Sequence, residues 1–245
     1  MNIVYVVPRY VPHTGGVETH VKELSERLVR RGHDVTVLTA DDSENVVSSE
    51  VRSGVKVIRH QGLAPDDAFH IAPTILRTIR AQQADVVHAH NYHSLPLLFA
   101  AINDVCTDAK FVATPHYHGG SASPLRNRLL SLYQPVGRWI LQRADDVIAV
   151  SPWERTRLQS DFGIDATVIP NGIAVGRFAN AEPFRYDRPY VLTVGRLEEY
   201  KGVQHIIRLV SKHPGYDLLV AGSGPYRDEL EKIADEIGVS DQVTF

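Results

Sequence analysis

Two cations stand close together where a strand-like run of the sequence gives way to a loop. Arg196 and Lys201 lie in the segment 195–202, which has glycine at both ends. Arginine offers a planar fork of N–H donors and lysine a compact charge, so this pair beside a helix start can hold a diphosphate. A charged loop that only contacts water would have the same composition. Further along, Gly222 and Gly224 form a turn that lets a ligand approach the backbone closely.

Paired glycines near the start of the chain form another candidate phosphate site. Gly15 and Gly16 precede a helix-length segment that carries Glu18 near its start. Backbone amides at the start of a helix can meet a phosphate or a sugar hydroxyl. A Gly-Gly turn is also common as a simple tight connection, and this one lacks the G-x-G-x-x-G spacing of dinucleotide-binding folds.

Five of the twelve histidines lie between positions 88 and 118. His116 and His118 follow a strand-like run, and a neutral imidazole there can donate or accept a hydrogen bond near neutral pH. The alternative is that they are polar loop residues without a chemical role.

A second interpretation of the histidines is a metal site. The spacing of His88, His90 and His93 resembles the H-x-H-x-D-H motif of metallo-beta-lactamase-like hydrolases, but Tyr92 stands where that motif has its aspartate. His88 and His90 would point to the same side of a strand, as two metal ligands can, yet the dinuclear site lacks its carboxylate. A strand end that lines a ligand-binding cleft explains the same residues without a metal.

A basic, partly apolar segment follows the histidines. Between Gly119 and Ala144 there is no acidic residue. Such a segment can rest on anionic lipid or on an anionic acceptor, or it can be a helix packed on the sheet with its arginines in water. Pro135 and Gly137 argue against one unbroken helix. The basic residues of the segment are Arg126, Arg128, Arg138 and Arg143.

Elements that would position these residues alternate along the chain. Short Val/Ile-rich runs without polar alternation recur from Ile3–Val7 to Thr167–Ile169 and again from Tyr190 onward. They suit parallel strands that are buried on both faces, and amphipathic helix-length segments lie between several of them. Ser151 and Glu154 predict a capped helix start. The pattern predicts an α/β fold with doubly wound sheets and ligands at the carboxyl ends of the strands.

The composition narrows the class of protein further. The chain has 245 residues, 43% of them apolar and 22% charged, with a net charge of -3, which disfavours a disordered or nucleic-acid-coating protein. Its single cysteine, Cys106, favours a reducing compartment. The sequence offers neither a secretory leader nor an uncharged apolar stretch of about 18 residues. We therefore expect a cytoplasmic protein whose membrane contact is peripheral.

The phosphate-binding candidates occur in an order that is more specific than any one of them. With the Gly15-Gly16 turn, the Arg196 and Lys201 loop, the Gly222 turn and the segment 168–173 (Val-Ile-Pro-Asn-Gly-Ile), the chain resembles the retaining GT-B glycosyltransferases of family 4, or glycosyl transferases group 1. The resemblance implies two Rossmann-like doubly wound domains that face a cleft. Their expected bounds are 1–175 for an acceptor domain, 176–188 for a linker and 189–245 for the first part of a nucleotide-sugar domain.

The resemblance also implies an activity and roles for individual residues. The enzyme would move a sugar, with retention, from a UDP- or GDP-sugar to a hydroxyl acceptor of a cell-surface glycan, glycolipid or polysaccharide, without a metal or other cofactor. Arg196 and Lys201 would neutralise the departing diphosphate, while His116 orients the reacting groups. Further donor contacts would come from Gly15, Gly16, Gly222 and Gly224, and the acceptor-side candidates are Glu18, His118, Asn171, Arg126 and Arg128.

One element of the family pattern is missing. The later Glu-x7-Glu element, which binds the donor sugar and ribose in the family, has no counterpart before Phe245. We therefore expect a C-terminally truncated chain whose second domain is incomplete. Two other functions remain open: a non-catalytic remnant that binds an acceptor or partner, and a zinc-dependent hydrolase built on His88, His90 and His93. Membrane contact, if made, would use residues 124–143 at the inner face of the cell membrane, and we expect no nucleic-acid partner.

Overall fold

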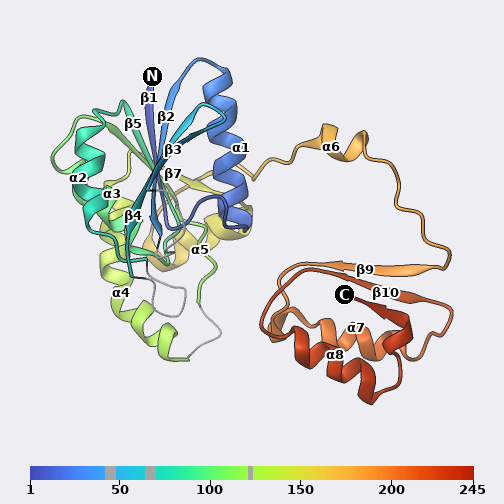
Figure 1. Ribbon diagram of the computed structural model, residues 1–245. Coiled ribbons are helices and arrows are strands. Elements are labelled where there is room, and N and C mark those ends of the chain that lie inside the picture. The colour runs from blue at the N-terminus through green and yellow to red at the C-terminus, as the bar shows by residue number, and fades with distance from the viewer. Residues whose placement is uncertain (42–47, 64–69, 121–123) are drawn as a thin grey trace. The chain divides into compact units, whose positions relative to one another are not determined.

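The computed structural model describes residues 1–41, 48–63, 70–120 and 124–245. The side chains of residues 41, 124–126 and 177 lie outside this description. The chain forms two compact units, Met1–Ile173 and Ala174–Phe245 (Figure 1).

The first unit is built on an eight-stranded sheet in the order β3-β4-β2-β1-β5-β6-β7-β8. Every pairing in it is parallel except that of β3 with β4. The predicted parallel, doubly wound sheet is thereby confirmed, and the antiparallel edge strand is an addition that the sequence pattern did not indicate. The strands are β1 Asn2–Val7, β2 Asp34–Asp41, β3 Ser49–Arg52, β4 Val55–Gln61, β5 Val86–His90, β6 Lys110–Thr114, β7 Asp146–Ala149 and β8 Thr167–Val168.

Helices cover both faces of this sheet (Figure 1). On one face Tyr5 and Val7 of β1 pack with Val21 of α1, while Val4 and Val6 point into the core of the other face. Alternate residues of β1 thus serve two cores, which is why the strand is apolar throughout. The helices of the unit are α1 Gly16–Arg30, α2 Thr74–Ala81, α3 Leu95–Asp104, α4 Pro124–Arg143 and α5 Pro152–Phe162.

Helix α4 corrects the expectation of a break at Pro135 and Gly137, because it continues through both residues. The side chain of Pro135 is exposed, so its ring projects away from the core. Gly137 is buried, and a Cβ there would collide with the Tyr92 ring. The glycine is therefore a packing requirement of an intact helix.

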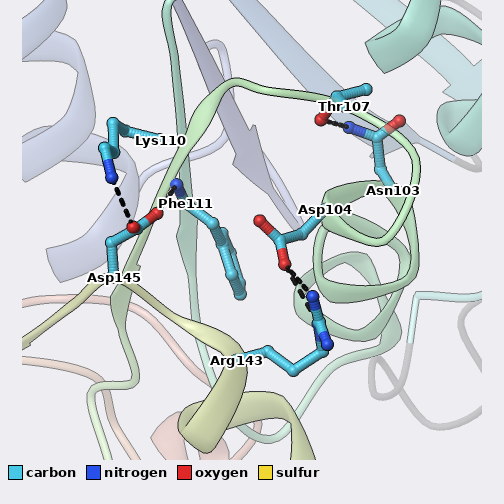
Figure 2. Close-up of polar contacts among 7 residues, drawn as sticks. All are labelled: Asn103, Asp104, Thr107, Lys110, Phe111, Arg143 and Asp145. Carbon is cyan, nitrogen blue, oxygen red and sulfur yellow. Dashed lines mark hydrogen bonds and ion pairs between the residues drawn. The ribbon is translucent and has the colours of Figure 1, made fainter.

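Polar contacts tie the amino ends of the strands together, opposite the edge where ligands are expected (Figure 2). Lys110 Nζ lies 2.7 Å from Asp145 Oδ1, and the Phe111 amide donates to the other carboxylate oxygen at 2.9 Å. Arg143, the last residue of α4, donates to Asp104 at the end of α3 at 2.7 Å. The first two bonds join the starts of β6 and β7, and the third joins the ends of α3 and α4.

The second unit holds a smaller parallel sheet in the order β11-β10-β9, with α7 and α8 packed in one core beside it. A short helix, α6, begins at the last residue of the expected first domain and otherwise lies in the expected linker, 176–188. The elements are α6 Val175–Ala179, β9 Tyr190–Val194, the 3-10 turn η2 Glu199–Lys201, α7 Val203–Val210, β10 Asp217–Ala221, α8 Arg227–Glu236, the 3-10 turn η3 Ser240–Gln242 and β11 Val243–Thr244.

Across the described parts of both units, the helices are too short or too polar to span a lipid bilayer.

Candidate active site

The direction of winding reverses at β1 in the first unit, since β2 pairs with one edge of β1 and β5 with the other. In open parallel sheets, ligands bind outside the carboxyl ends of the strands at such a reversal. The loop after β1 carries Gly15 and Gly16, and His90 and His116 lie at the ends of β5 and β6. The topology therefore brings together the turn and the histidine region that the sequence separates by about 70 residues.

Gly15 is required by packing rather than by its backbone angles. It forms the N-cap of α1 in an extended conformation, with φ of -175°. A Cβ on this residue would collide with the carboxylate of Glu18, which folds back against the turn. Glu18 is buried and forms an ion pair with Arg9 at 3.4 Å. The Glu18 carboxylate therefore packs against Gly15, whereas Gly16 has open space around its Cα.

Histidine rings of β5 and of the loop after β6 form a continuous ladder. His88 and His90 lie on the same strand face with ring centroids 4.3 Å apart. His90 is fully buried, and its Nδ1 lies 3.1 Å from Nε2 of His116. At the other end, Nε2 of His88 lies 2.8 Å from the Thr114 hydroxyl. The ring of Tyr5 packs beside the two strand histidines at 5.2 and 5.7 Å.

Sequence reasoning missed one member of this group, His20 of α1. Its ring meets His90 edge-on at 5.7 Å and His116 edge-on at 6.0 Å. His20 lies one helical turn after Gly16, so the two residues share one face of α1. This spacing was the available signal, although the two strands that it meets could not be known from the pattern.

The pKa values of these histidines are lowered because burial disfavours the charged imidazolium. Burial, together with the neighbouring histidines, lowers the pKa of His88 to about 3 and that of His116 to about 4. The pKa of His90 falls well below its ordinary value for the same reasons, and burial also lowers that of His20. The four rings are therefore neutral near pH 7.

His116 is held by its backbone as well as by its ring. The residue adopts a left-handed conformation with φ of 48°, which is uncommon outside glycine and concentrates at functional sites. The next amide, that of Tyr117, donates to Glu154 Oε1 at 2.5 Å. Glu154 is buried, and its second oxygen accepts from the Val150 amide at 2.7 Å. The sequence predicted only a capping role for Glu154, whereas this carboxylate joins the His116 loop to the end of β7.

Replacing Glu154 by glutamine is expected to loosen this junction. An amide has one oxygen, so its NH2 group would face a backbone N–H and leave a buried donor unsatisfied, at a cost of about 1–3 kcal/mol. Urea unfolding followed by tryptophan fluorescence measures this loss. The matched control is Asp165→Asn, because Asp165 forms an exposed pair with Arg155 in the same unit and its loss should have little effect. Equal stability of E154Q and wild type would contradict the bridging role.

The other candidates of the first unit take different positions. His118 is exposed and stacks on His93, with ring centroids 4.1 Å apart, so it belongs to a second ring pair rather than to the ladder. Asn171 is exposed, three positions after the end of β8. Arg128 is exposed on α4, and the side chain of Arg126 lies outside the described residues.

The zinc hypothesis gains no geometric support. Within the part of the chain that the structure describes, no three His, Cys, Asp or Glu side chains are grouped as a metal ion requires. His88 and His90 are joined instead to Thr114 and His116 by hydrogen bonds, and His93 stacks with Tyr117 and His118.

In the second unit the two predicted cations share the loop that follows β9. Both side chains are exposed; Arg196 forms an ion pair with Glu198, and Lys201 Nζ lies 5.1 Å from the Tyr200 ring centroid. Gly202, which follows, has φ of 75° and caps α7. Lys201 therefore lies directly before the start of α7, where the partial positive charge of the helix adds to its own, and Arg196 lies five positions earlier in the same loop.

The glycine turn after β10 packs directly beneath this loop. A Cβ on Gly222 would collide with the Gly195 carbonyl, and one on Gly224 with the Leu197 carbonyl. The Leu197 amide donates to the Ser223 carbonyl at 2.8 Å. The two loops form one backbone-paired surface, and the glycines are needed for their close approach.

Comparison with known proteins assigns this architecture to a family. The chain is 33% identical to a glycogen synthase of Mycobacterium tuberculosis over 94% of its own length and 29% identical to a GDP-mannose-dependent alpha-(1-6)-phosphatidylinositol monomannoside mannosyltransferase of Mycolicibacterium smegmatis over 96%. It spans 63% and 64% of the lengths of these relatives.

Solved structures confirm the fold. The chain matches Anabaena Alr3699/HepE in complex with UDP-glucose with a TM-score of 0.72 and 18% identity, over 100% of this chain and 68% of that one. The profile described as Glycosyltransferase Family 4 matches residues 14–177, and that described as Glycosyl transferases group 1 matches residues 177–245. The loop with Arg196 and Lys201 and the turn with Gly222 and Gly224 therefore lie in the group 1 region. The histidine ladder lies in the family 4 region. By these matches, and by the GT-B fold that it shares with them, the chain belongs to glycosyltransferase family 4.

Proposed function

We propose that this chain carries the sites of a retaining glycosyltransferase that moves a sugar from a nucleotide diphosphate sugar to a hydroxyl acceptor. The observation that carries the proposal is the loop between β9 and α7, in which Arg196 and Lys201 are both exposed and Lys201 directly precedes the capping residue of α7. A diphosphate is the ligand that such a fork and point charge bind best.

The chemistry follows from charge. When the bond between the anomeric carbon and the diphosphate oxygen breaks, negative charge develops on the diphosphate. Cations that are already in place stabilise that charge without reorganising during the reaction. Arg196 and Lys201 supply this stabilisation in the proposal, so the protein needs no divalent metal for it. His116, neutral and held by its ring and backbone, orients the reacting groups.

The donor nucleotide is proposed to be UDP or GDP. The mycobacterial relative is named as GDP-mannose-dependent, and the Anabaena structure contains UDP-glucose. Both of these sugar nucleotides contain a diphosphate, which agrees with a loop that binds the diphosphate of the donor. The glycines of both turns, Gly15 and Gly16 in one and Gly222 and Gly224 in the other, would supply backbone contacts to the donor.

The function is tested by incubating the enzyme, as its own cell makes it, with a panel of UDP-, GDP- and ADP-sugars and simple hydroxyl acceptors. We expect release of a nucleoside diphosphate from at least one donor and a product with the anomeric configuration of the donor, read by NMR. Product with inverted configuration would overturn the retaining mechanism. Binding of a glycan without turnover of any donor would favour a binding protein instead.

The acceptor is proposed to be a glycolipid or another cell-surface glycan reached from the inner face of the cell membrane. Leu129, Leu132, Val136 and Trp139 are exposed along α4 with spacings that place them on one stripe. Arg128 is exposed on the same helix, and Arg138 donates to the Phe162 carbonyl, an uncharged acceptor that does not compensate its positive charge. An apolar stripe beside arginines suits the surface of an anionic bilayer.

Vesicle binding tests this surface. The double substitution Leu132→Glu and Trp139→Glu should abolish sedimentation with phosphatidylglycerol vesicles, because it places charge where the stripe would enter the interface. Wild type should sediment with the phosphatidylglycerol vesicles at low salt and dissociate from them at high salt. It should bind phosphatidylcholine vesicles only weakly. Leu209→Glu, which changes an exposed leucine of α7, is the matched control. Equal binding by the double variant and wild type would rule out α4 as the contact.

A further inference from the structure

We propose that His90 is a positioning residue that fixes which nitrogen of His116 carries the proton, so that His116 offers an N–H donor at Nδ1 to its ligand. The inference rests on the proposed function only for the nature of that ligand, a sugar hydroxyl or a phosphate oxygen. The arrangement of the two rings stands independently of it.

The hydrogen bond between the rings of His90 and His116 contains one proton, which one of the two facing nitrogens carries. Nδ1 of His90 and Nε2 of His116 are 3.1 Å apart, and the rings are nearly parallel, with an interplanar angle of 23°. Both rings are neutral near pH 7, since burial lowers both pKa values. In a neutral pair one nitrogen donates and the other accepts, and the remaining nitrogen of each ring takes the complementary state.

The far nitrogen of His90 decides between the two arrangements. Nε2 of His90 is buried and finds no hydrogen-bond partner among the residues that the structure describes. A buried N–H without an acceptor is rarer and costlier than a bare lone pair. Nε2 of His90 is therefore the bare nitrogen, and its proton lies on Nδ1. His90 then donates to Nε2 of His116, which leaves the proton of His116 on Nδ1.

The surroundings keep both rings in this arrangement. Tyr5 and His88 pack against His90 from the strand side, at 5.7 and 4.3 Å between ring centroids. His20 meets both rings edge-on. On the other side, the bond from the Tyr117 amide to Glu154 fixes the backbone next to His116. His116 is only partly buried, so its Nδ1–H is a polar group of this ladder that a ligand can reach.

The test uses NMR of the 245-residue chain with 15N-labelled histidine, in which nitrogen shifts report the tautomer of each ring. We expect His116 as the Nδ1–H tautomer in wild type. His90→Phe keeps a ring in the ladder but removes the donor, so His116 should turn toward the Nε2–H form that free histidine prefers. His90→Asn places an amide N–H near the former Nδ1 position and should restore the Nδ1–H form.

A matched control separates this role from general packing. His88→Phe changes a ring on the same strand face that bonds to Thr114 and not to His116, so it should leave the tautomer of His116 unchanged. An Nε2–H tautomer of His116 in wild type, or the same tautomer in wild type and H90F, would overturn the proposal. Should H90F fail to fold, His90→Leu, which also removes the donor, takes its place with the same expected tautomer of His116.

Kinetics provide the second readout in the active enzyme. H90F should lower kcat on the order of 100-fold while leaving KM for the donor nearly unchanged, because a misplaced proton affects the reacting state more than binding. H90N should recover most of that loss. Absence of sugar transfer by wild type would contradict the proposed function without affecting the tautomer result, so the two failures are distinguishable. Equal kcat for H90F and wild type would show that the tautomer has no role in transfer.

Discussion

Replacing Lys201 by alanine is expected to lower the turnover of the active enzyme on the order of 100-fold to 1,000-fold. The lysine is a point charge that, in the proposed mechanism, stabilises the diphosphate as it departs. Because this charge matters most in the transition state, kcat should fall more than the affinity for the donor. Steady-state kinetics with the donor identified from the sugar-nucleotide panel give the required values of kcat and KM.

Folding should be nearly unaffected by the same change. Lys201 is exposed and lies outside the apolar core formed by α7, α8 and β10, so we expect a stability change within about 0.5 kcal/mol. Lys212→Ala, at an exposed position just after α7, is the matched control and should retain wild-type turnover. Arg196→Lys keeps the charge of its site but loses the guanidinium fork, so it should fall between wild type and K201A. Wild-type turnover in K201A would remove the lysine from the mechanism.

Acid is expected to unfold the first unit unusually early. The folded-state pKa of His88 is about 3, below its ordinary value of 6.5, so the unfolded chain binds a proton in a pH range where the folded chain does not. Stability is therefore fully present above about pH 6.5 and falls as pH drops from there toward 3. For His88 alone the loss between pH 7 and pH 5 is about 2 kcal/mol. His116 and His90, whose pKa values are also lowered, add losses of the same sign.

Urea unfolding at pH 7 and pH 5 measures this effect. Trp139 and Trp153 are the two tryptophans of the sequence and both lie in the first unit, so their fluorescence reports its unfolding. His88→Phe should reduce the difference between the two pH values, because phenylalanine takes up no proton in the unfolded chain. The exposed His118 of the same unit supplies the control, His118→Gln, which should leave the difference unchanged. Equal stability of wild type at both pH values would contradict the buried, neutral ladder.

Much of the sheet could be predicted from the sequence because buried parallel strands are continuous apolar runs. The runs at Ile3–Val7 and Tyr190–Val194 became β1 and β9 within one residue of the expected bounds. The antiparallel strand β3, Ser49–Arg52, has no such run, since it lies at an edge and is mostly exposed. Local spacing also misjudged Pro135, because the decisive contact, Gly137 against Tyr92, joins residues 45 positions apart.

The residues of the candidate site could likewise be predicted where sequence neighbours decide their position, and not where contacts between distant segments decide it. The positions of Arg196 and Lys201 on one loop follow from adjacency in the sequence, so the pattern was sufficient. The ladder depends on which strands are neighbours, because His90 and His116 meet only when β5 pairs with β6. His20 joins them only because α1 packs on the face of the sheet where the strand histidines lie. The bridging role of Glu154 was hidden because its local capping pattern already explained its presence.

The central claim is that the protein's own cations, and not a metal ion, hold the diphosphate. It is tested most directly by titrating the active enzyme with the nucleoside diphosphate of its donor in the presence of EDTA, for wild type and for the double variant Arg196→Ala, Lys201→Ala. The account predicts metal-independent binding by wild type and a loss of affinity on the order of 100-fold in the double variant. Equal affinity in the two proteins, or binding by wild type that appears only when a divalent metal is restored, would contradict it.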